Sequence, residues 1–160
     1  MTDVNSNRIL TLFTLAVYWT CLLIGLTIPW LATIVIDMLK HDQTLGQALH
    51  QLRLHLFAPG YNLFLVALFN AVPFVLFAVF ALFHMGRAPV HDRRLCGRRG
   101  AGVLMAALAL VMFSAWTHAM TLWHPDAQGA IAYLFLPLVL LAVAPVAYAV
   151  GRALAPFIFR

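Results

Sequence analysis

Four polar side chains recur at helical spacing in an otherwise apolar part of the chain: Ser114, Thr117, His118 and Thr121. On a helix these positions share one face. A serine and a histidine one turn apart could form the hydroxyl–imidazole pair of a nucleophilic enzyme. However, the sequence around Ser114 reads Phe-Ser-Ala rather than the glycine-flanked turn of a hydrolase, and it identifies no oxyanion donor. The chain also has no Glu and no phosphate-binding glycine loop, so we expect it not to be an enzyme.

The histidines raise the question of a metal site, because imidazole is a common ligand of zinc and copper. Asp37 and His41 have the i, i+4 spacing of a ligand pair. The sequence has no His-Glu-x-x-His motif and no closely spaced cysteines, so we expect neither a metal nor another cofactor. The weak metal candidates are Asp37, His41, His118 and His124.

Long apolar runs must position these residues, in a chain that is 64% hydrophobic and 9% charged. Each run has the about 20 residues that a helix needs to cross a bilayer. Backbone amides in lipid must be satisfied within the segment, which favours helices. We therefore expect an all-α polytopic membrane protein, a single membrane domain over residues 1–160. Its four transmembrane helices are expected at about 9–36, 61–85, 101–123 and 129–151.

The loop between the first two runs, residues 37–60, contains a further helical pattern. Its apolar residues recur at helical spacing, Thr44 is a candidate N-cap, and Pro59-Gly60 is a stop signal. This pattern predicts a short amphipathic helix at the outer membrane interface.

The loop between the second and third runs, residues 86–100, predicts the orientation of the chain. It is rich in arginine, whereas the loop between the third and fourth runs has no Lys or Arg. Positive residues in short loops stay cytoplasmic, so we expect this loop and both termini to face the cytoplasm of a bacterial inner membrane. The arginines should fix topology and attract anionic lipids. No aromatic residue interleaves them, so we expect no nucleic-acid binding. These residues are Arg87, Arg93, Arg94, Arg98 and Arg99, and the tail 152–160 should return to the inner interface.

The depth of the polar residues can be compared between helices in this orientation. Thr27, Asn70 and Ser114 each fall roughly 13–14 Å from the outer end of their run, at 1.5 Å per residue. Asn70 is the most costly to leave unpaired, and Ser114 and His118 are its expected partners. Together with Thr117, these residues form either an interhelical hydrogen-bonding layer or an outward-facing pocket centred on His118.

Small residues four apart allow close helix approach, either within the bundle or between protomers. The pairs are Gly102 with Ala106, Ala147 with Gly151, and Gly151 with Ala155.

The segment Asp126-Ala-Gln-Gly-Ala-Ile-Ala-Tyr-Leu-Phe-Leu-Pro-Leu resembles a stretch of small, uncharacterised four-helix bacterial inner-membrane proteins. Some proteins of that size and topology are immunity proteins against membrane-targeting toxins. The resemblance implies an inner-membrane location and a protein partner, and it assigns no site residues.

Two functions are consistent with the sequence. The first is a non-catalytic partner protein, an accessory subunit or immunity-type protein that binds another membrane polypeptide or forms a homo-oligomer. The second is a small-molecule or metal-binding membrane protein with an outward-facing polar pocket around His118 and Asn70. An oligomeric pore is disfavoured, because no span carries a ring of charged residues.

Overall fold

The computed structural model describes residues 2–59, 62–87, 93–125 and 129–158, and the regular elements in these ranges are all helices. They are α1 (Thr2–Lys40), α2 (Leu45–His55), α3 (Leu63–Gly86), α4 (Arg93–Trp123) and α5 (Gly129–Ile158). All except α2 are long and apolar enough to cross a membrane. The expected class, all-α with four long apolar helices and a short helix between the first and second, is confirmed for these residues.

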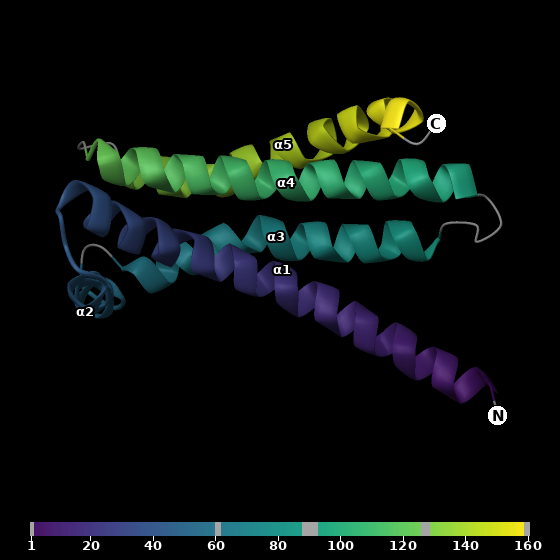
Figure 1. Cartoon of the computed structure of the whole chain (residues 1–160), viewed down its shortest axis with the longest axis horizontal. Helices are drawn as coiled ribbons and strands as arrows, with labels where there is room; N and C mark the ends of the chain where they lie inside the picture. Colours follow the sequence, from purple (N-terminus) through teal and green to yellow (C-terminus); the bar gives the residue numbers. More distant parts are fainter. Residues whose placement is uncertain (1, 60–61, 88–92, 126–128, 159–160) are drawn as a thin grey trace.

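The long helices form an elongated bundle in which neighbours in sequence are not always the main neighbours in space. The most extensive packing is between α4 and α5 and between α1 and α3. One end of the bundle carries α2, and we call it the α2 end (Figure 1). The other end carries the end of α3, the start of α4, the start of α1 and the end of α5, and we call it the Arg-rich end. In Figure 1, α1 crosses α3 obliquely, and its N-terminal half diverges from the other helices.

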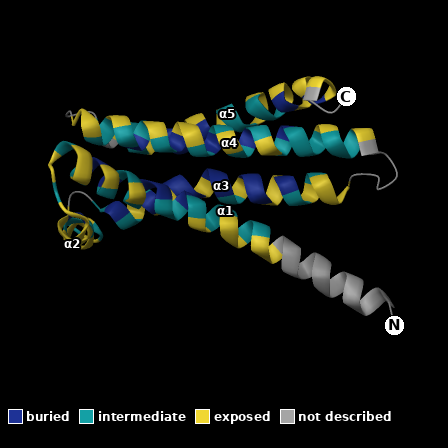
Figure 2. Cartoon of the chain, in the orientation of Figure 1, coloured by how far each residue is buried: buried dark blue, intermediate teal, exposed yellow. Residues whose placement is uncertain are grey.

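The core of the bundle is lined by both large and small side chains, while many large apolar side chains point outward (Figure 2). Met112 and Trp116, for example, are two-thirds exposed. A water-soluble monomer rarely exposes so much contiguous apolar surface, whereas lipid chains cover it without cost. The core residues are Ile28, Phe74, Phe77, Ala81, Ala106, Leu110, Leu136 and Leu140.

Glycines lie at two close helix crossings. A Cβ atom on Gly25 of α1 would lie 2.7 Å from the Cα of Ala71 in α3. A Cβ atom on Gly151 of α5 would lie 2.6 Å from the carbonyl oxygen of Ala101 in α4. The small residues at 102 and 151 therefore serve contacts within the bundle, one of the two uses that their spacing allowed.

Three helices extend beyond the charge-free runs from which they were expected. α1 continues to Lys40, α4 begins at Arg93 within the expected arginine loop, and α5 continues to Ile158 through the expected tail. The absence of charge delimits the part of a helix that can lie in hydrocarbon, but it does not delimit the helix. Long basic side chains reach the polar interface while their backbone stays helical.

The short helix α2 begins as the sequence predicts. Thr44 and Gln47 form a capping box, in which each side chain accepts a hydrogen bond from the backbone N–H of the other residue. α2 ends at His55, before Pro59, and it packs against α1 through the buried Ala48. Leu45 and Leu49, which share one face of α2, are exposed, and so is Leu54 on the opposite face, which the amphipathic pattern does not explain.

Candidate functional site

A buried hydrogen-bond network joins three helices near the middle of the bundle. Asn70 of α3 is 2% exposed, and its Nδ2 atom donates to the carbonyl oxygen of Gly25 in α1 at 2.7 Å. The hydroxyl of Ser114 in α4 donates to Asn70 Oδ1, also at 2.7 Å. Of the two partners expected for Asn70, the structure therefore shows Ser114. The Asn70 side chain bridges α1 and α4 through polar bonds inside an apolar core.

The acceptor on α1 is available because of a proline. In a regular helix the carbonyl of Gly25 would accept the N–H of residue 29, but residue 29 is proline and has no N–H. The Asn70 amide supplies the missing donor. Gly25 also lacks a Cβ, which permits the contact with Ala71 one residue beyond Asn70. Sequence reasoning did not identify Gly25, although Pro29 four residues later was the signal that could have found it.

His118 lies on the same face of α4 as Ser114 but outside this network. Its ring is 1% exposed and stacks on Tyr133 of α5, with centroids 5.1 Å apart and planes 23° apart. Its Nε2 atom is buried without a hydrogen-bond partner in the described part of the chain. A buried polar atom without a partner costs free energy, which makes His118 a candidate for interaction with a ligand.

The threonines expected in the polar layer satisfy their hydroxyls differently. The hydroxyl of Thr27 donates to the carbonyl of Leu23 at 2.8 Å, within α1. The hydroxyl of Thr121 donates to the carbonyl of Thr117, within α4. Both Thr27 and Thr117 are half-buried. The structure therefore brings Asn70 and Ser114 together across helices, while the Thr27 hydroxyl bonds within its own helix.

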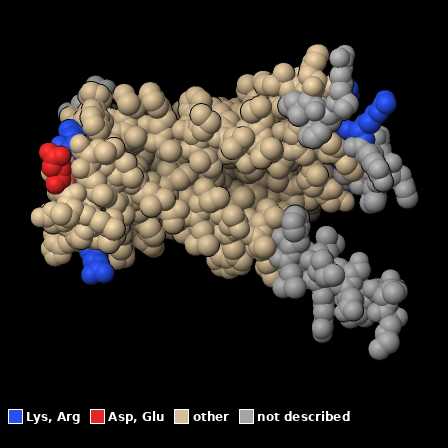
Figure 3. All heavy atoms as spheres, viewed as in Figure 1, with Lys and Arg blue, Asp and Glu red and all other residues tan. Residues whose placement is uncertain are grey.

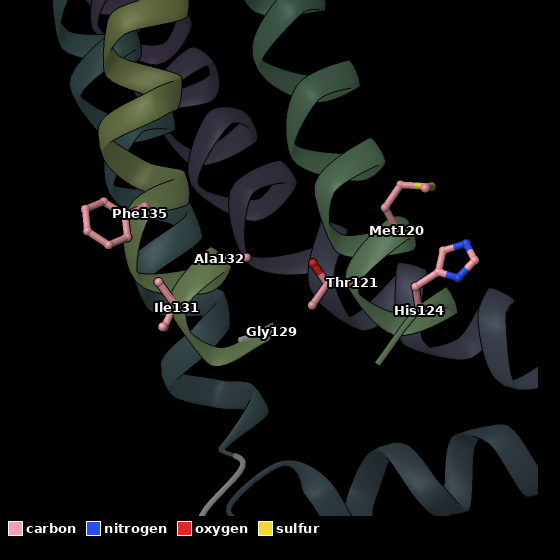
Figure 4. A pocket seen from close by; sticks show the side chains of 7 residues that line it. All are labelled: Met120, Thr121, His124, Gly129, Ile131, Ala132 and Phe135. Atoms are coloured by element: carbon pink, nitrogen blue, oxygen red, sulfur yellow. The ribbon is translucent and has the colours of Figure 1, made fainter. Parts of the chain in front are cut away.

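A pocket of about 550 Å³ opens between α4 and α5 at the α2 end (Figure 4). Its two polar side chains are Thr121, which is already bonded to its own helix, and the exposed His124. Asn70, Ser114 and His118 are not among the lining residues. The lining residues are Met120, Thr121, His124, Gly129, Ile131, Ala132 and Phe135.

The weak metal candidates are not gathered into one site. His118 is buried in the bundle, His124 is exposed at the end of α4, and Asp37 is half-buried near the end of α1. The backbone carbonyl oxygen of Asp37 accepts the backbone N–H of His41, but this bond does not involve either side chain. Within the described ranges, no three His, Cys, Asp or Glu residues are grouped closely enough to hold a metal ion.

At the Arg-rich end, α3, α4 and α5 meet in a cluster of aromatic and basic side chains. The Tyr148 hydroxyl of α5 contacts His84 Nε2 of α3, and His84 stacks on Phe80. Arg99 Nη1 donates to the carbonyl oxygen of His84 at 2.9 Å. The guanidinium of Arg152 lies over the Tyr148 ring, 5.8 Å from its centroid. Sequence reasoning identified Arg99 but missed the aromatic residues, which are spread over two other helices.

The remaining arginines expected to fix topology or attract anionic lipids belong to elements near the same end. Arg87 follows α3 and lies over the ring of Phe83, 5.8 Å from its centroid. Arg94 and Arg98 are exposed on the first turns of α4, and the side chain of Arg93 is outside the described residues. At the opposite end, Lys40 of α1 donates to the carbonyl oxygen of Trp123 at 2.6 Å, where α4 ends. A cation at a helix C-terminus is favourable because the last carbonyls carry partial negative charge.

Searches for similar proteins found no family model, no curated protein and no solved structure that matches this chain. The segment that resembles small inner-membrane proteins forms the start of α5, except for residues 126–128, which are outside the described residues.

Proposed function

We propose that this protein is a non-catalytic integral membrane protein of the bacterial inner membrane that binds another membrane polypeptide. The contact surface is the N-terminal half of α1, and the partner supplies a transmembrane helix. Both termini and the Arg-rich end face the cytoplasm, as the clustering of Arg87, Arg94, Arg98 and Arg99 at that end favours.

The divergence of α1 from the bundle carries this proposal (Figure 1). Helices of a four-helix bundle ordinarily stay within about 20° of one another along their length. α1 instead packs on α3 at the Gly25–Ala71 crossing and then leaves it toward the Arg-rich end.

The diverging half of α1 has a surface suited to another helix. Leu15, Trp19 and Leu23 are spaced four residues apart, and each is about half exposed. Side chains at this spacing form a ridge that fits the groove of a neighbouring helix. Large, rigid aromatic side chains such as Trp19 dominate the energetics of many protein contacts.

Site-specific photo-crosslinking in native membranes tests the contact. A benzophenone amino acid at Trp19 should give a discrete crosslinked product. One at Met112, an apolar and more exposed position on α4, should not. Mass spectrometry of the product identifies the partner, including a second copy of this chain. Only lipid adducts at both positions, together with a monomeric mass after gentle extraction, would refute the proposal.

Within this class, an immunity-type role predicts a specific phenotype. A strain that lacks the protein should become sensitive to a membrane-targeting toxin, and expression of the Trp19→Ala variant should restore less protection than the wild type. Normal toxin resistance in the deletion strain would exclude the immunity role while leaving the crosslinking result to decide the wider proposal.

The second candidate function is a ligand or metal site around His118 and Asn70. The observation that favours it is the unpartnered Nε2 atom of the buried His118. Native mass spectrometry of the gently extracted protein should then show a small added mass that the His118→Ala variant loses. An unliganded wild-type mass, with unchanged function in His118→Ala and Asn70→Leu, would eliminate this candidate.

A further inference from the structure

The aromatic and basic cluster at the Arg-rich end includes two guanidinium groups, each in contact with a residue of the His84–Tyr148 pair. Arg99 of α4 donates to the carbonyl oxygen of His84 in α3, and Arg152 of α5 lies over the ring of Tyr148, whose hydroxyl contacts His84. A Cβ atom on Gly102 would lie 2.9 Å from Arg152 Cγ and 2.7 Å from the Tyr148 ring. Because Gly102 has no side chain, Arg152 and Tyr148 can lie directly on α4, one turn from Arg99.

The contacts of these two arginines fix their positions and leave donors free. Arg99 is half-buried and uses one N–H for the carbonyl of His84, in the last turn of α3. Arg152 is exposed and is oriented by the face of Tyr148, whose hydroxyl is in turn held by His84. A guanidinium has five N–H donors, so both arginines retain donors for an anion.

Among the residues whose side chains are described, no carboxylate neutralises this pair. Asp37 lies in the last turn of α1 and Asp42 follows that helix, both at the α2 end. Figure 3 shows the visible acidic atoms at this end. Lys and Arg atoms are visible at both ends, but the visible acidic atoms are confined to the α2 end. A pair of like charges held near each other is stabilised by a bound anion, and guanidinium groups match the geometry of phosphate oxygens.

We propose that Arg99 and Arg152 bind the headgroup phosphate of an anionic phospholipid at the membrane interface. Tyr148 and His84 are positioning residues: they hold Arg152 toward Arg99 without needing to touch the lipid. Phe80 completes the cluster, and its half-exposed ring offers an apolar contact on the membrane side of the two arginines. This site is specific and differs from a general attraction of exposed arginines to a negative surface. It requires that the helices cross a membrane, but it does not depend on a protein partner.

The test is native mass spectrometry of the full chain in micelles that contain equal amounts of phosphatidylglycerol and phosphatidylcholine. The measured quantity is the ratio of the two lipids retained. A single arginine near an anionic surface changes the affinity about fivefold by general attraction, at about 1 kcal/mol per charge. Loss of a bidentate contact should exceed this, so Arg152→Gln should lower the ratio by about tenfold or more.

Matched variants separate a site from general charge. Arg98→Gln removes the same charge from an exposed position on α4 and should lower the ratio by about fivefold at most. Tyr148→Phe removes no charge but releases His84, and it should also lower the ratio. Equal effects of Arg152→Gln and Arg98→Gln, with no effect of Tyr148→Phe, would overturn the proposal. Thermal unfolding of each variant in the same micelles identifies any general loss of structure. If Arg152→Gln has lost structure, Arg152→Lys replaces it, and the site predicts that this variant retains an intermediate ratio of the two lipids.

A further arm distinguishes lipid from free phosphate. Millimolar inorganic phosphate should leave the retained phosphatidylglycerol unchanged, because the lipid chains keep the headgroup at the site. Displacement of the lipid by inorganic phosphate would overturn the assignment to lipid.

Discussion

Asn70→Leu should destabilise the bundle, and the structure shows how the cost arises. The substitution removes two interhelical hydrogen bonds of 2.7 Å each. Such bonds in membrane proteins contribute on average about 0.6 and at most about 1.7 kcal/mol each. The carbonyl of Gly25 also loses its donor, because Pro29 cannot replace it, and an unsatisfied buried acceptor costs about 1–3 kcal/mol. We therefore expect a loss of about 2–6 kcal/mol in the free energy of unfolding.

A double-mutant cycle isolates the contribution of the proline. In Pro29→Ala the N–H of residue 29 can donate to the carbonyl of Gly25. Asn70→Leu should then cost about 1–3 kcal/mol less than it does in the wild type. The assay is reversible unfolding in detergent micelles, followed by circular dichroism. Thr27→Val is the control, because its hydroxyl is bonded within its own helix, and it should cost less than about 0.5 kcal/mol. An equal cost of Asn70→Leu in both backgrounds would refute the idea that Asn70 compensates for the proline.

Three further predictions concern other parts of the fold. Gly151→Ala should cost about 1–3 kcal/mol, since its Cβ would meet the α4 backbone, whereas Gly97→Ala has open space and should be neutral or stabilising; melting temperatures in micelles compare them. Thr44→Ala removes the capping box and should cost about 1 kcal/mol, measured as faster amide hydrogen exchange confined to α2, and uniform exchange would contradict it. Lys40→Met should release the end of α4 and speed exchange near Trp123, whereas unchanged exchange there would show that the contact is unimportant.

The long helices could be predicted from sequence because each contains a charge-free apolar run of at least about 20 residues. The start of α2 could also be predicted from sequence, because Thr44 and Gln47 carry a capping signal that depends only on local spacing. The ends of the long helices could not be predicted. The helical backbone continues beyond the apolar runs, so charge at residues such as Arg93 and Lys40 does not mark the end of a helix.

The candidate site was predictable only where depth alone decides the contact. Depth placed Asn70 and Ser114 at one level, and they are bonded. Depth cannot show how a helix is rotated about its axis. It therefore could not show that Thr27 bonds within α1, or that Tyr133 of α5 faces His118. The same uncertainty hid the contact of His84 with Tyr148, which depends on how α5 faces α3.

The N-terminal part of α1 projects from the bundle, because the interhelical hydrogen bonds of this helix lie in its C-terminal part. The helix is held to the bundle by the Asn70 bond to Gly25 and by the bond of Lys40 to Trp123. Cys21 and Ile24 still pack on the core, so residues 2–20 form the free part, roughly 28 Å long at 1.5 Å per residue. A tilt of about 10° would displace the far end by roughly 5 Å over that length. A partner that pushes on α1 near Trp19 would therefore bend the helix at Gly25, whose carbonyl receives no hydrogen bond from Pro29. The bond from the Asn70 amide to this carbonyl would resist the bending.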